Sequence, residues 1–310
     1  MVELSINSKI FYYNTSTGRI KLKKSIITDQ FSQDFEESAK LAREFNFEFV
    51  EIHSLWNKNI EELTDSEIID VKNILHKHNL KVSLLGTTLF LMCPLYTEVE
   101  KLIKLKDSFL VYSGTYEKHF KVLKRCIDIC KEFDVKFIRL FPFRKEMGIN
   151  KDLSEIIKDI SVKFEKPIEE AEKEGISLIL ENCPHSYLPK GLMTFEVVKL
   201  LNSKNLGLLW DIGNTFRTLD SNIPEKYRNY DIFKEYEKIK EKIRYYHFKD
   251  YNEVNERFSH VTFGKGDIDY IGIQKSIIND KFEGYISLES EVEDFQNVID
   301  SAKNFKTLGL

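Results

Sequence analysis

Residues 176–181 read Ile-Ser-Leu-Ile-Leu-Glu, an apolar run that stops on the carboxylate of Glu181. Three later apolar runs also stop on a carboxylate or an imidazole, at Asp211, His247 and Glu289. Chemistry in α/β proteins sits at the carboxyl ends of parallel strands. In an open sheet, strands lie ~4.8 Å apart, so four consecutive ends would spread over roughly 14 Å. Because a closed sheet turns the same ends around one axis, their convergence predicts an eight-fold barrel.

The rest of the chain fits the order of such a barrel, in which strands alternate with helices. Apolar or alternating runs predict eight strands, over residues 2–11, 47–53, 80–87, 135–141, 176–181, 206–211, 243–249 and 284–289. Amphipathic stretches between them predict helices, and Pro167 predicts a kink or a break into two helices within one of these stretches. The expected fold class is therefore α/β, a single (β/α)8 TIM barrel.

Three segments are longer than simple connections, and each follows a predicted strand: 92–114, 212–231 and 251–266. They predict long βα loops over the C-terminal face of the barrel, where α/β proteins place binding loops. No linker or shift in composition divides the chain. We therefore expect one barrel domain over residues 1–310.

The composition is that of an ordinary globular protein, with 42% hydrophobic and 31% charged residues among 310. The formal net charge is -4 and no basic stripe occurs, which disfavours nucleic acid as a partner. The longest apolar runs fall short of the ~20 residues that a membrane helix needs, and the N-terminus lacks the pattern of a signal peptide. The four cysteines form no Cys-x-x-Cys pair. We expect a cytoplasmic protein with free thiols and no membrane partner.

The four strand-end residues together offer three carboxylates and one imidazole: Glu181, Asp211, Glu289 and His247. This mostly hard, oxygen-rich set suits one divalent metal ion, Mn²⁺, Mg²⁺, Co²⁺ or Zn²⁺. Charged residues are common at strand ends, so each one alone could be a solvated side chain. Their recurrence on four successive strands favours a shared metal site.

The motifs around these residues resemble those of a known family. They are Leu178-Ile-Leu-Glu181-Asn182 followed by Pro184, Trp210-Asp211-Ile-Gly213-Asn214, His247-Phe-Lys249-Asp250, Gly264-Lys-Gly266-Asp267 with Asp269, and Leu288-Glu289. The chain resembles the sugar phosphate isomerase/epimerase group of the xylose isomerase-like TIM barrels, which are relatives of endonuclease IV. The resemblance implies a single divalent metal ion, with substrate oxygens completing its coordination, held by Glu181, Asp211, His247 and Glu289. It also implies an isomerase or epimerase of a sugar or a sugar-like polyhydroxy carbonyl compound.

At two places the sequence differs from members of this family, and each difference disfavours one specific activity. Ketose 3-epimerases of the group carry a His three residues after the Asp ligand, where this chain has Asn214, which cannot act as a cation. Endonuclease IV holds three metals with many His ligands, several of them on the earlier strands. Here the third and fourth strand runs end in Leu85-Gly86-Thr87 and Leu140-Phe141-Pro142, so a trinuclear site is not expected.

Other polar residues would reach the same mouth. Lys249 lies two residues beyond His247 and would face the same way in an extended segment, so its ammonium could stabilise an oxyanion on the substrate. We assign proton transfer at carbon to Glu181 and Glu289. Arg139 falls within the apolar fourth strand and needs a carboxylate partner inside the barrel. The candidates for substrate binding are Glu51, His53, His185, Asn214 and His260. Of these, Glu51 could also be the carboxylate that pairs with Arg139.

Three other functions could use the same residues. A dehydratase of a keto-polyol, of inosose or dehydroshikimate type, would release water from its substrate. The others are an endonuclease IV-like phosphodiesterase and a non-catalytic sugar-binding barrel. Aromatic residues near the strand ends predict an apolar wall, compatible with sugar stacking or with the interface of a homo-oligomer: Phe90, Tyr96, Phe143, Tyr187 and Phe216. The expected partner is a small-molecule sugar or polyol.

Overall fold

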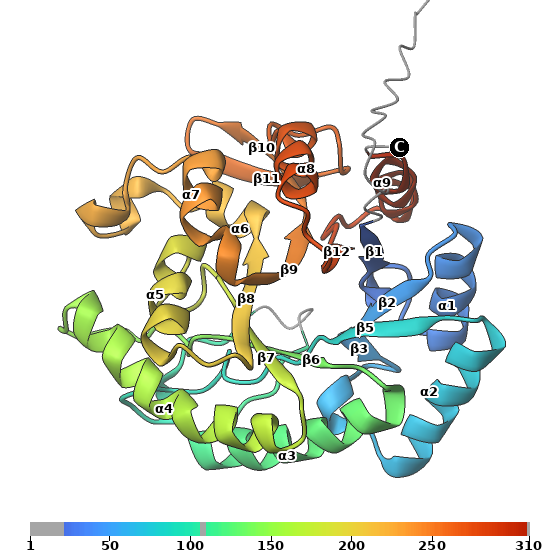
Figure 1. Cartoon of the computed structure of the whole chain (residues 1–310), viewed down its shortest axis with the longest axis horizontal. Coiled ribbons are helices and arrows are strands. Elements are labelled where there is room, and N and C mark those ends of the chain that lie inside the picture. Colours follow the sequence, from blue (N-terminus) through green and yellow to red (C-terminus); the bar gives the residue numbers. More distant parts are fainter. Residues whose placement is uncertain (1–21, 106–109, 309–310) are drawn as a thin grey trace, which may run out of the picture.

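The computed structural model describes residues 22–105 and 110–308 and shows a parallel sheet that curves into a barrel, with helices around the outside (Figure 1). The eight strands of this sheet are β1 Lys23–Ile26, β2 Phe49–Ile52, β5 Lys81–Leu85, β6 Phe137–Leu140, β7 Ser177–Glu181, β8 Leu206–Asp211, β9 Ile243–Phe248 and β12 Tyr285–Leu288. They are hydrogen-bonded in the order β1-β12-β9-β8-β7-β6-β5-β2. The predicted α/β barrel is confirmed.

The barrel is nearly closed between β1 and β2, which are the two ends of the sheet order. A parallel bridge joins Ile27 to Glu51, and the hydroxyl of Thr28 donates to the carbonyl oxygen of Glu51 at 3.4 Å. The ammonium of Lys24 ties β1 to the C-terminal end of the last helix. It donates at 2.8 Å to the carbonyl oxygens of Phe305, Lys306 and Leu308. The bridge and the hydrogen bond from Thr28 hold β2, which carries Glu51, against the end of β1.

Seven of the predicted strands are confirmed, with each end within two residues of its predicted position. The expected strand over residues 2–11 lies outside the described residues. The prediction for the first barrel strand is wrong, because β1 takes that place. This strand is only four residues long and begins with Lys23 and Lys24, so its apolar pattern is too short to be recognised.

Helices follow the strands and cover the outer face of the barrel (Figure 1). Their bounds are α1 Phe35–Glu44, α2 Asp65–Lys77, α3 Tyr116–Phe133, α4 Leu153–Lys173, α5 Gly191–Leu201, α7 Ile232–Ile239, α8 Tyr270–Asn279 and α9 Phe295–Thr307. None of these helices in the described part of the chain combines the length and the apolar character of a membrane span.

The helix α4 runs through Pro167 as one element, so of the two outcomes predicted, a kink or a break into two helices, the break is wrong. Proline removes one backbone hydrogen bond from a helix interior. Here Ile160, Phe164 and Ile168 are buried on both sides of the proline. This continuous packing against the barrel outweighs the lost bond.

Shorter elements lie in the loops that follow the strands. They are the helix α6 Ile212–Phe216 and two hairpins, β3 Ser54–Leu55 with β4 Lys58–Asn59, and β10 Asp250–Val254 with β11 Arg257–Val261. The second hairpin fills much of the predicted long segment 251–266 and can be followed in Figure 1. The long βα loops are therefore partly structured.

The aromatic residues expected to form a wall around the mouth do not all do so. Phe90 and Phe143 are completely buried, and their ring centroids lie 5.3 Å apart. Both have a positive φ, near 67° and 58°, in turns of the loops after β5 and β6. They are part of the core, so the prediction of a wall is wrong for these two. The four cysteines are buried free thiols, as expected.

The interior of the barrel has an apolar layer beneath its mouth. Ile179, Leu209 and Tyr245 are buried and form a small cluster with Leu84. Because side chains alternate along a strand, the residue two positions further on faces the same way. On β7, β8 and β9 these next inward positions are Glu181, Asp211 and His247. The candidate site residues thus lie above a buried, mostly apolar layer, whose one hydroxyl, on Tyr245, is hydrogen-bonded to Ser83 at 2.9 Å.

Candidate active site

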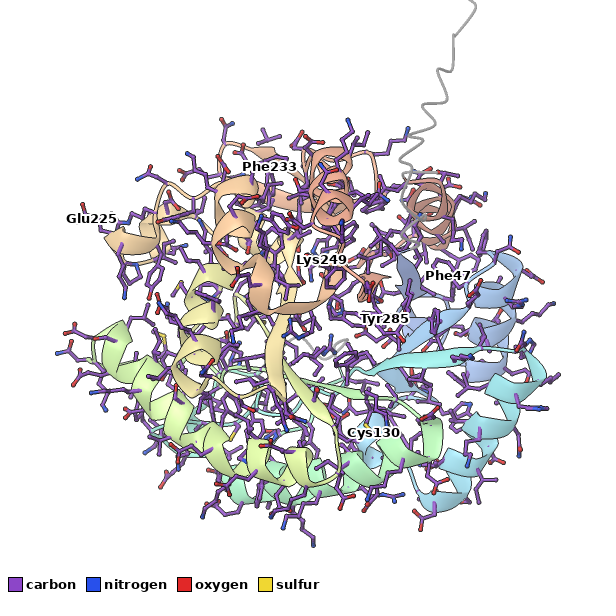
Figure 2. All side chains as sticks on the ribbon, in the orientation of Figure 1. Phe47, Cys130, Glu225, Phe233, Lys249 and Tyr285 are labelled. Carbon is purple, nitrogen blue, oxygen red and sulfur yellow. The ribbon has the colours of Figure 1, made fainter. Side chains whose placement is uncertain are left out.

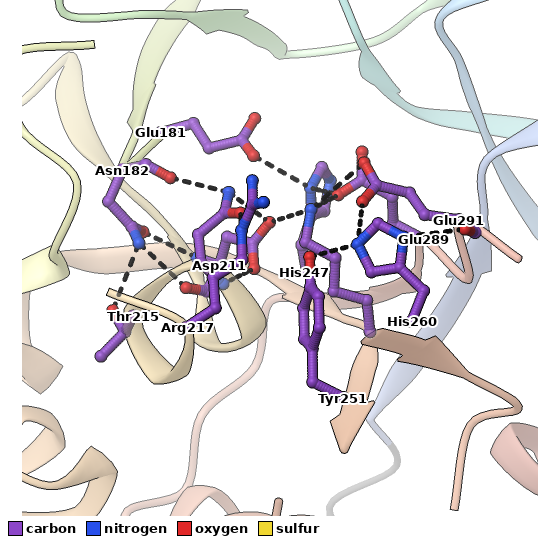
Figure 3. Close-up of polar contacts among 12 residues, drawn as sticks. Glu181, Asn182, Asp211, Thr215, Arg217, His247, Tyr251, His260, Glu289 and Glu291 are labelled. Carbon is purple, nitrogen blue, oxygen red and sulfur yellow. Dashed lines mark hydrogen bonds and ion pairs between the residues drawn. The ribbon is translucent and has the colours of Figure 1, made fainter. Parts of the chain in front are cut away.

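Four polar side chains converge at the C-terminal mouth of the barrel, as the sequence predicts. They are Glu181 from β7, Asp211 from β8, His247 from β9 and Glu289 directly after β12. All four are buried, and one potential ligand atom from each lies within 4.8 Å of the others (Figure 3). This spacing is short enough for one ion to contact all four.

The imidazole of His247 is oriented by Glu51 from β2. Its Nε2 lies 2.9 Å from Oε2 of Glu51 and 3.2 Å from Oε1. Its Nδ1 faces Glu181 and Glu289 at 3.6 and 3.4 Å, and makes no hydrogen bond among the described residues. Burial alone would lower the pKa of His247, but the carboxylates, Glu51 first, raise it well above its ordinary value. A neutral imidazole that donates Nε2–H to Glu51 presents the Nδ1 lone pair to the cluster, an arrangement common in metal sites.

Asp211 is held by two asparagines. Its backbone N–H donates to Oδ1 of Asn182 at 2.9 Å. The backbone and side-chain N–H groups of Asn214 donate to its two carboxylate oxygens, each at 2.8 Å. Burial raises the pKa of Asp211 to about 7, although the nearby Lys249 ammonium acts in the opposite direction. The predicted candidate Asn214 therefore orients a carboxylate of the cluster.

Lys249 reaches the mouth as predicted, and Figure 2 shows it near the centre of the barrel. Its Nζ lies 2.8 Å from Asp211 Oδ2 and 2.7 Å from Glu289 Oε2. Glu291 is a third partner at 3.3 Å. Burial would lower the pKa of Lys249, but these carboxylates raise it well above its ordinary value, so the side chain is an ammonium.

Arg139 enters the cluster from β6 on the opposite side. Its Nη1 lies 3.6 Å from Glu51, the partner expected from the sequence, and also 3.3 Å from Glu181 and 3.8 Å from Glu289. Its other guanidinium nitrogens donate to the carbonyl oxygens of Gly86 and Thr87. The cation therefore bridges three carboxylates from three different strands.

The charges in this cluster of described residues do not balance. Its five carboxylates are Glu51, Glu181, Asp211, Glu289 and Glu291. Its three cations are Arg139, Lys249 and Arg217, of which the last lies beside Asp211 (Figure 3). The raised pKa of His247 makes it an imidazolium when no ion is bound, which leaves one negative charge in the cluster. A divalent ion that binds Nδ1 needs the neutral imidazole, so it would then meet two negative charges and neutralise them. Nδ1 of His247 and Oε2 of Glu181 are buried without a hydrogen bond to any described residue, so the residues present fit such an ion.

The remaining predicted residues lie around this cluster. His53 is buried, and its Nδ1 lies 2.6 Å from Oδ2 of Asp29. At the rim, His260 contacts the hydroxyl of Tyr251 and lies 3.0 Å from Glu291. The imidazole of His185 is exposed in the loop after β7, outside the group of candidate ligands.

A cavity of about 350 Å³ opens beside Glu289. It is lined by Ile27, Asp29, Gln30, Gln33, His53, Ser54, Asn57, Leu110, Glu289 and Glu291. Its volume lies in the range of small-molecule sites. Since Glu289 belongs both to this lining and to the four candidate ligands, the cavity adjoins the cluster.

Sequence reasoning missed Asp29, Arg217 and Glu291 as parts of this mouth. Asp29 follows β1, whose position was predicted wrongly. Glu291 lies two residues beyond Glu289, and this spacing was an available signal. Arg217 follows Asn214 by three residues, and its Nε donates to Oδ1 of Asn214 at 3.2 Å. This contact depends on the short helix α6, which was not predicted from the sequence.

Gly213 should be required for the position of Lys249. A Cβ built on Gly213 would lie 2.5 Å from Cγ and 3.0 Å from the carbonyl oxygen of Lys249, so α6 or β9 would have to shift. We expect Gly213→Ala to lower the free energy of unfolding in urea by about 1–3 kcal/mol. In the control Gly114→Ala, the new Cβ would meet only the flexible side chain of Lys118, at 3.2 Å, and should cost less. Equal stability of Gly213→Ala and the unaltered protein would contradict this packing.

Comparison with known proteins agrees with the fold. A family model described as a xylose isomerase-like TIM barrel matches residues 39–308. The chain is also 27% identical over 222 residues to the uncharacterized protein MJ1311 of Methanocaldococcus jannaschii, an alignment that covers 68% of this chain and 69% of that protein.

Solved structures of the same shape include enzymes of different reactions. The 3-keto-D-glucoside 4-epimerase YcjR from E. coli has a TM-score of 0.67 and 14% identity, covering 92% of this chain and 99% of that one. The probable 3-DHS dehydratase AsbF from Bacillus anthracis has a TM-score of 0.68 and 15% identity, covering 93% and 100%. The IOLI protein, solved with a bound zinc atom, has a TM-score of 0.64 and 16% identity, covering 92% and 96%.

At these identities the solved structures show a shared fold. The family model spans most of the chain, and the eight parallel strands of the sheet agree with the barrel that it describes. The chain belongs to the xylose isomerase-like TIM barrel family.

Proposed function

We propose that this protein binds one divalent metal ion through Glu181, Asp211, His247 and Glu289, and that it isomerises or epimerises a polyhydroxylated carbonyl compound. The observation that carries the proposal is the buried group of three carboxylates and an imidazole, whose Nδ1 has no hydrogen bond among the described residues. A bound Mn²⁺, Zn²⁺, Co²⁺ or Mg²⁺ would supply Lewis-acid stabilisation of negative charge on a substrate oxygen. The zinc atom in the IOLI structure supports the choice of a divalent ion.

In this proposal Glu289 removes the proton from the reacting carbon. It is the candidate ligand that also lines the cavity, so it can contact a substrate held there. Although burial acts to raise its pKa, Lys249 and then His247 hold the pKa of Glu289 well below its ordinary value. The base is therefore ionised at neutral pH, and fixed geometry compensates for its low basicity.

Two other side chains complete the chemistry. Glu181 is the second carboxylate, which returns a proton in an epimerisation, whereas an aldose-ketose isomerisation could use one carboxylate on one face. Lys249 keeps its ammonium among the carboxylates of the mouth and stabilises an oxyanion on the substrate. Of the predicted substrate-binding residues, Glu51 and Asn214 act through the ligands that they orient, and His53 and His260 lie where a substrate hydroxyl could reach them.

A dehydratase of a keto-polyol is the second candidate function. The pair of His53 and Asp29 lines the same cavity as Glu289, and its imidazole could protonate a leaving hydroxyl. AsbF, named a probable dehydratase, shares the fold. Loss of water from the product would distinguish this reaction from an isomerisation.

The other two alternatives require different findings. An endonuclease IV-like trinuclear centre needs many imidazoles, whereas the group of candidate ligands found within residues 22–105 and 110–308 contains one. A sugar-binding barrel without catalysis would bind the metal and a polyol but exchange no protons.

Removing one anionic ligand should weaken metal binding. Asp211→Asn keeps an N-cap for α6 but loses the charge, so we expect less than half of the roughly one equivalent of metal to survive dialysis. Asp231→Asn is the matched control, since Asp231 caps α7 in the same way on the protein surface. Elemental analysis measures both variants. Full retention of metal in Asp211→Asn would remove this residue from the ligand set.

Metal affinity should depend on pH. Because the pKa of Asp211 is raised to about 7, its carboxyl group is protonated below that pH and must lose a proton when the ion binds. We expect the affinity to fall between pH 8 and pH 5, by about tenfold per pH unit for each proton released. Competition with a chelator at each pH measures it. An affinity that stays constant across this range would speak against carboxylate and imidazole ligands.

Turnover in heavy water should place deuterium on the reacting carbon. Proton NMR of the zinc-loaded protein with aldoses, ketoses and keto-polyols would detect this exchange. We expect Glu289→Gln to slow it by at least about 10²-fold at saturating zinc, because the variant has no carboxylate to act as the base. Glu293→Gln, an exposed change of the same kind, should retain it. Exchange that persists in Glu289→Gln would exclude this residue as the base.

A further inference from the structure

The charge of the cavity beside Glu289 does not suit a sugar phosphate. Its lining includes the carboxylates of Asp29, Glu289 and Glu291, while none of its described lining residues is Lys or Arg. The imidazole of His53 also lines it, but lies 2.6 Å from Asp29, so any positive charge on His53 is already paired. The described wall of the cavity therefore has no spare cation.

The cations just behind this wall are also engaged. Lys249 lies within 3.3 Å of Asp211, Glu289 and Glu291. A divalent ion in the cluster would balance the two remaining negative charges there, as the charges of the surrounding residues indicate. A phosphate that entered the cavity would add about two negative charges, for which the residues described in the wall offer no cationic partner.

The hydrogen-bonding groups of the cavity also favour an uncharged ligand over a phosphorylated one. A carboxylate only accepts hydrogen bonds, and so does a fully ionised phosphate, whereas a hydroxyl can donate. Oδ1 of Asp29 has no hydrogen bond among the described residues, and this side chain is only 8% exposed. The amide of Gln33 already donates to Ser54, at 2.8 Å. The wall thus presents the carboxylate acceptors of Asp29, Glu289 and Glu291 beside the neutral amides of Gln30 and Asn57, a set that matches the hydroxyls of a polyol.

We infer that the cavity takes an uncharged polyol and rejects the phosphate monoester of the same compound. This inference rests on the proposed function, because it names the substrate class of the same site. The carboxylates of the wall repel the phosphate group, and they cannot donate a hydrogen bond to it.

Binding to matched pairs of ligands tests the inference. Isothermal titration calorimetry of the zinc-loaded protein would compare D-fructose, D-tagatose and myo-inositol with the monophosphate of each. We expect the free polyol of at least one pair to bind about tenfold or more tightly than its phosphate, and no phosphate to bind better than its parent. A phosphate that binds as tightly as its parent, or the failure of every polyol to bind, would overturn the inference.

A variant with one fewer carboxylate in the cavity wall tests whether the charge of the wall causes the preference for the free polyol. Glu291→Gln removes one carboxylate from the wall and should narrow the ratio of the two affinities by about threefold or more. Glu225→Gln makes the same change in net charge on an exposed residue at the periphery (Figure 2), and should leave the ratio unchanged. Equal ratios in both variants would show that the wall does not discriminate by charge.

The same experiment separates this inference from the proposed function. Calorimetry reports binding without turnover, while proton exchange reports the reaction. Tight binding of a free polyol without exchange would leave the inference standing and refute the isomerase. Proton exchange that is faster with a phosphorylated sugar than with the free sugar would support the isomerase and refute the inference about the cavity.

Discussion

Unbalanced negative charge on the buried side chains of the barrel mouth is the constraint on which the rest of this structure depends. Five carboxylates meet three cations there, above an apolar layer formed by Leu84, Ile179, Leu209 and Tyr245. Buried charge is costly unless it is paired. Arg139 and Lys249 pair part of it directly, and the two charges that remain account for the fit to a divalent ion. The alternation of side chains along β7, β8 and β9 is what concentrates these groups at one depth.

The support of the cluster extends outward through the helices. Asn182 and Asn214 fix Asp211, and Glu51 fixes His247. Behind Asp211, the side chain of Asn182 also donates to Thr215, whose hydroxyl donates to the buried carboxylate of Glu235 on α7 at 2.7 Å. Orienting a ligand by such outer contacts is as important to a metal site as the ligand itself.

Sequence alone predicted the parts of this arrangement that follow from periodicity. The convergence of Glu181, Asp211, His247 and Glu289 followed from four apolar runs that stop on polar residues, and the structure brings the four together. The first strand could not be predicted, since β1 has only two buried residues, Ser25 and Ile26. Asp29 was missed with it. Contacts that depend on loop conformation, such as Arg217 with Asn214, have no signature in the periodicity.

X-ray absorption at the zinc edge of the zinc-loaded protein would test most directly whether this cluster is a metal centre. We expect one ion per chain, with oxygen and nitrogen neighbours at about 2.0–2.2 Å and the scattering of a single imidazole, which His247→Ala should abolish. A sulfur neighbour near about 2.3 Å, two or more imidazoles, or an unchanged spectrum in His247→Ala would contradict the account.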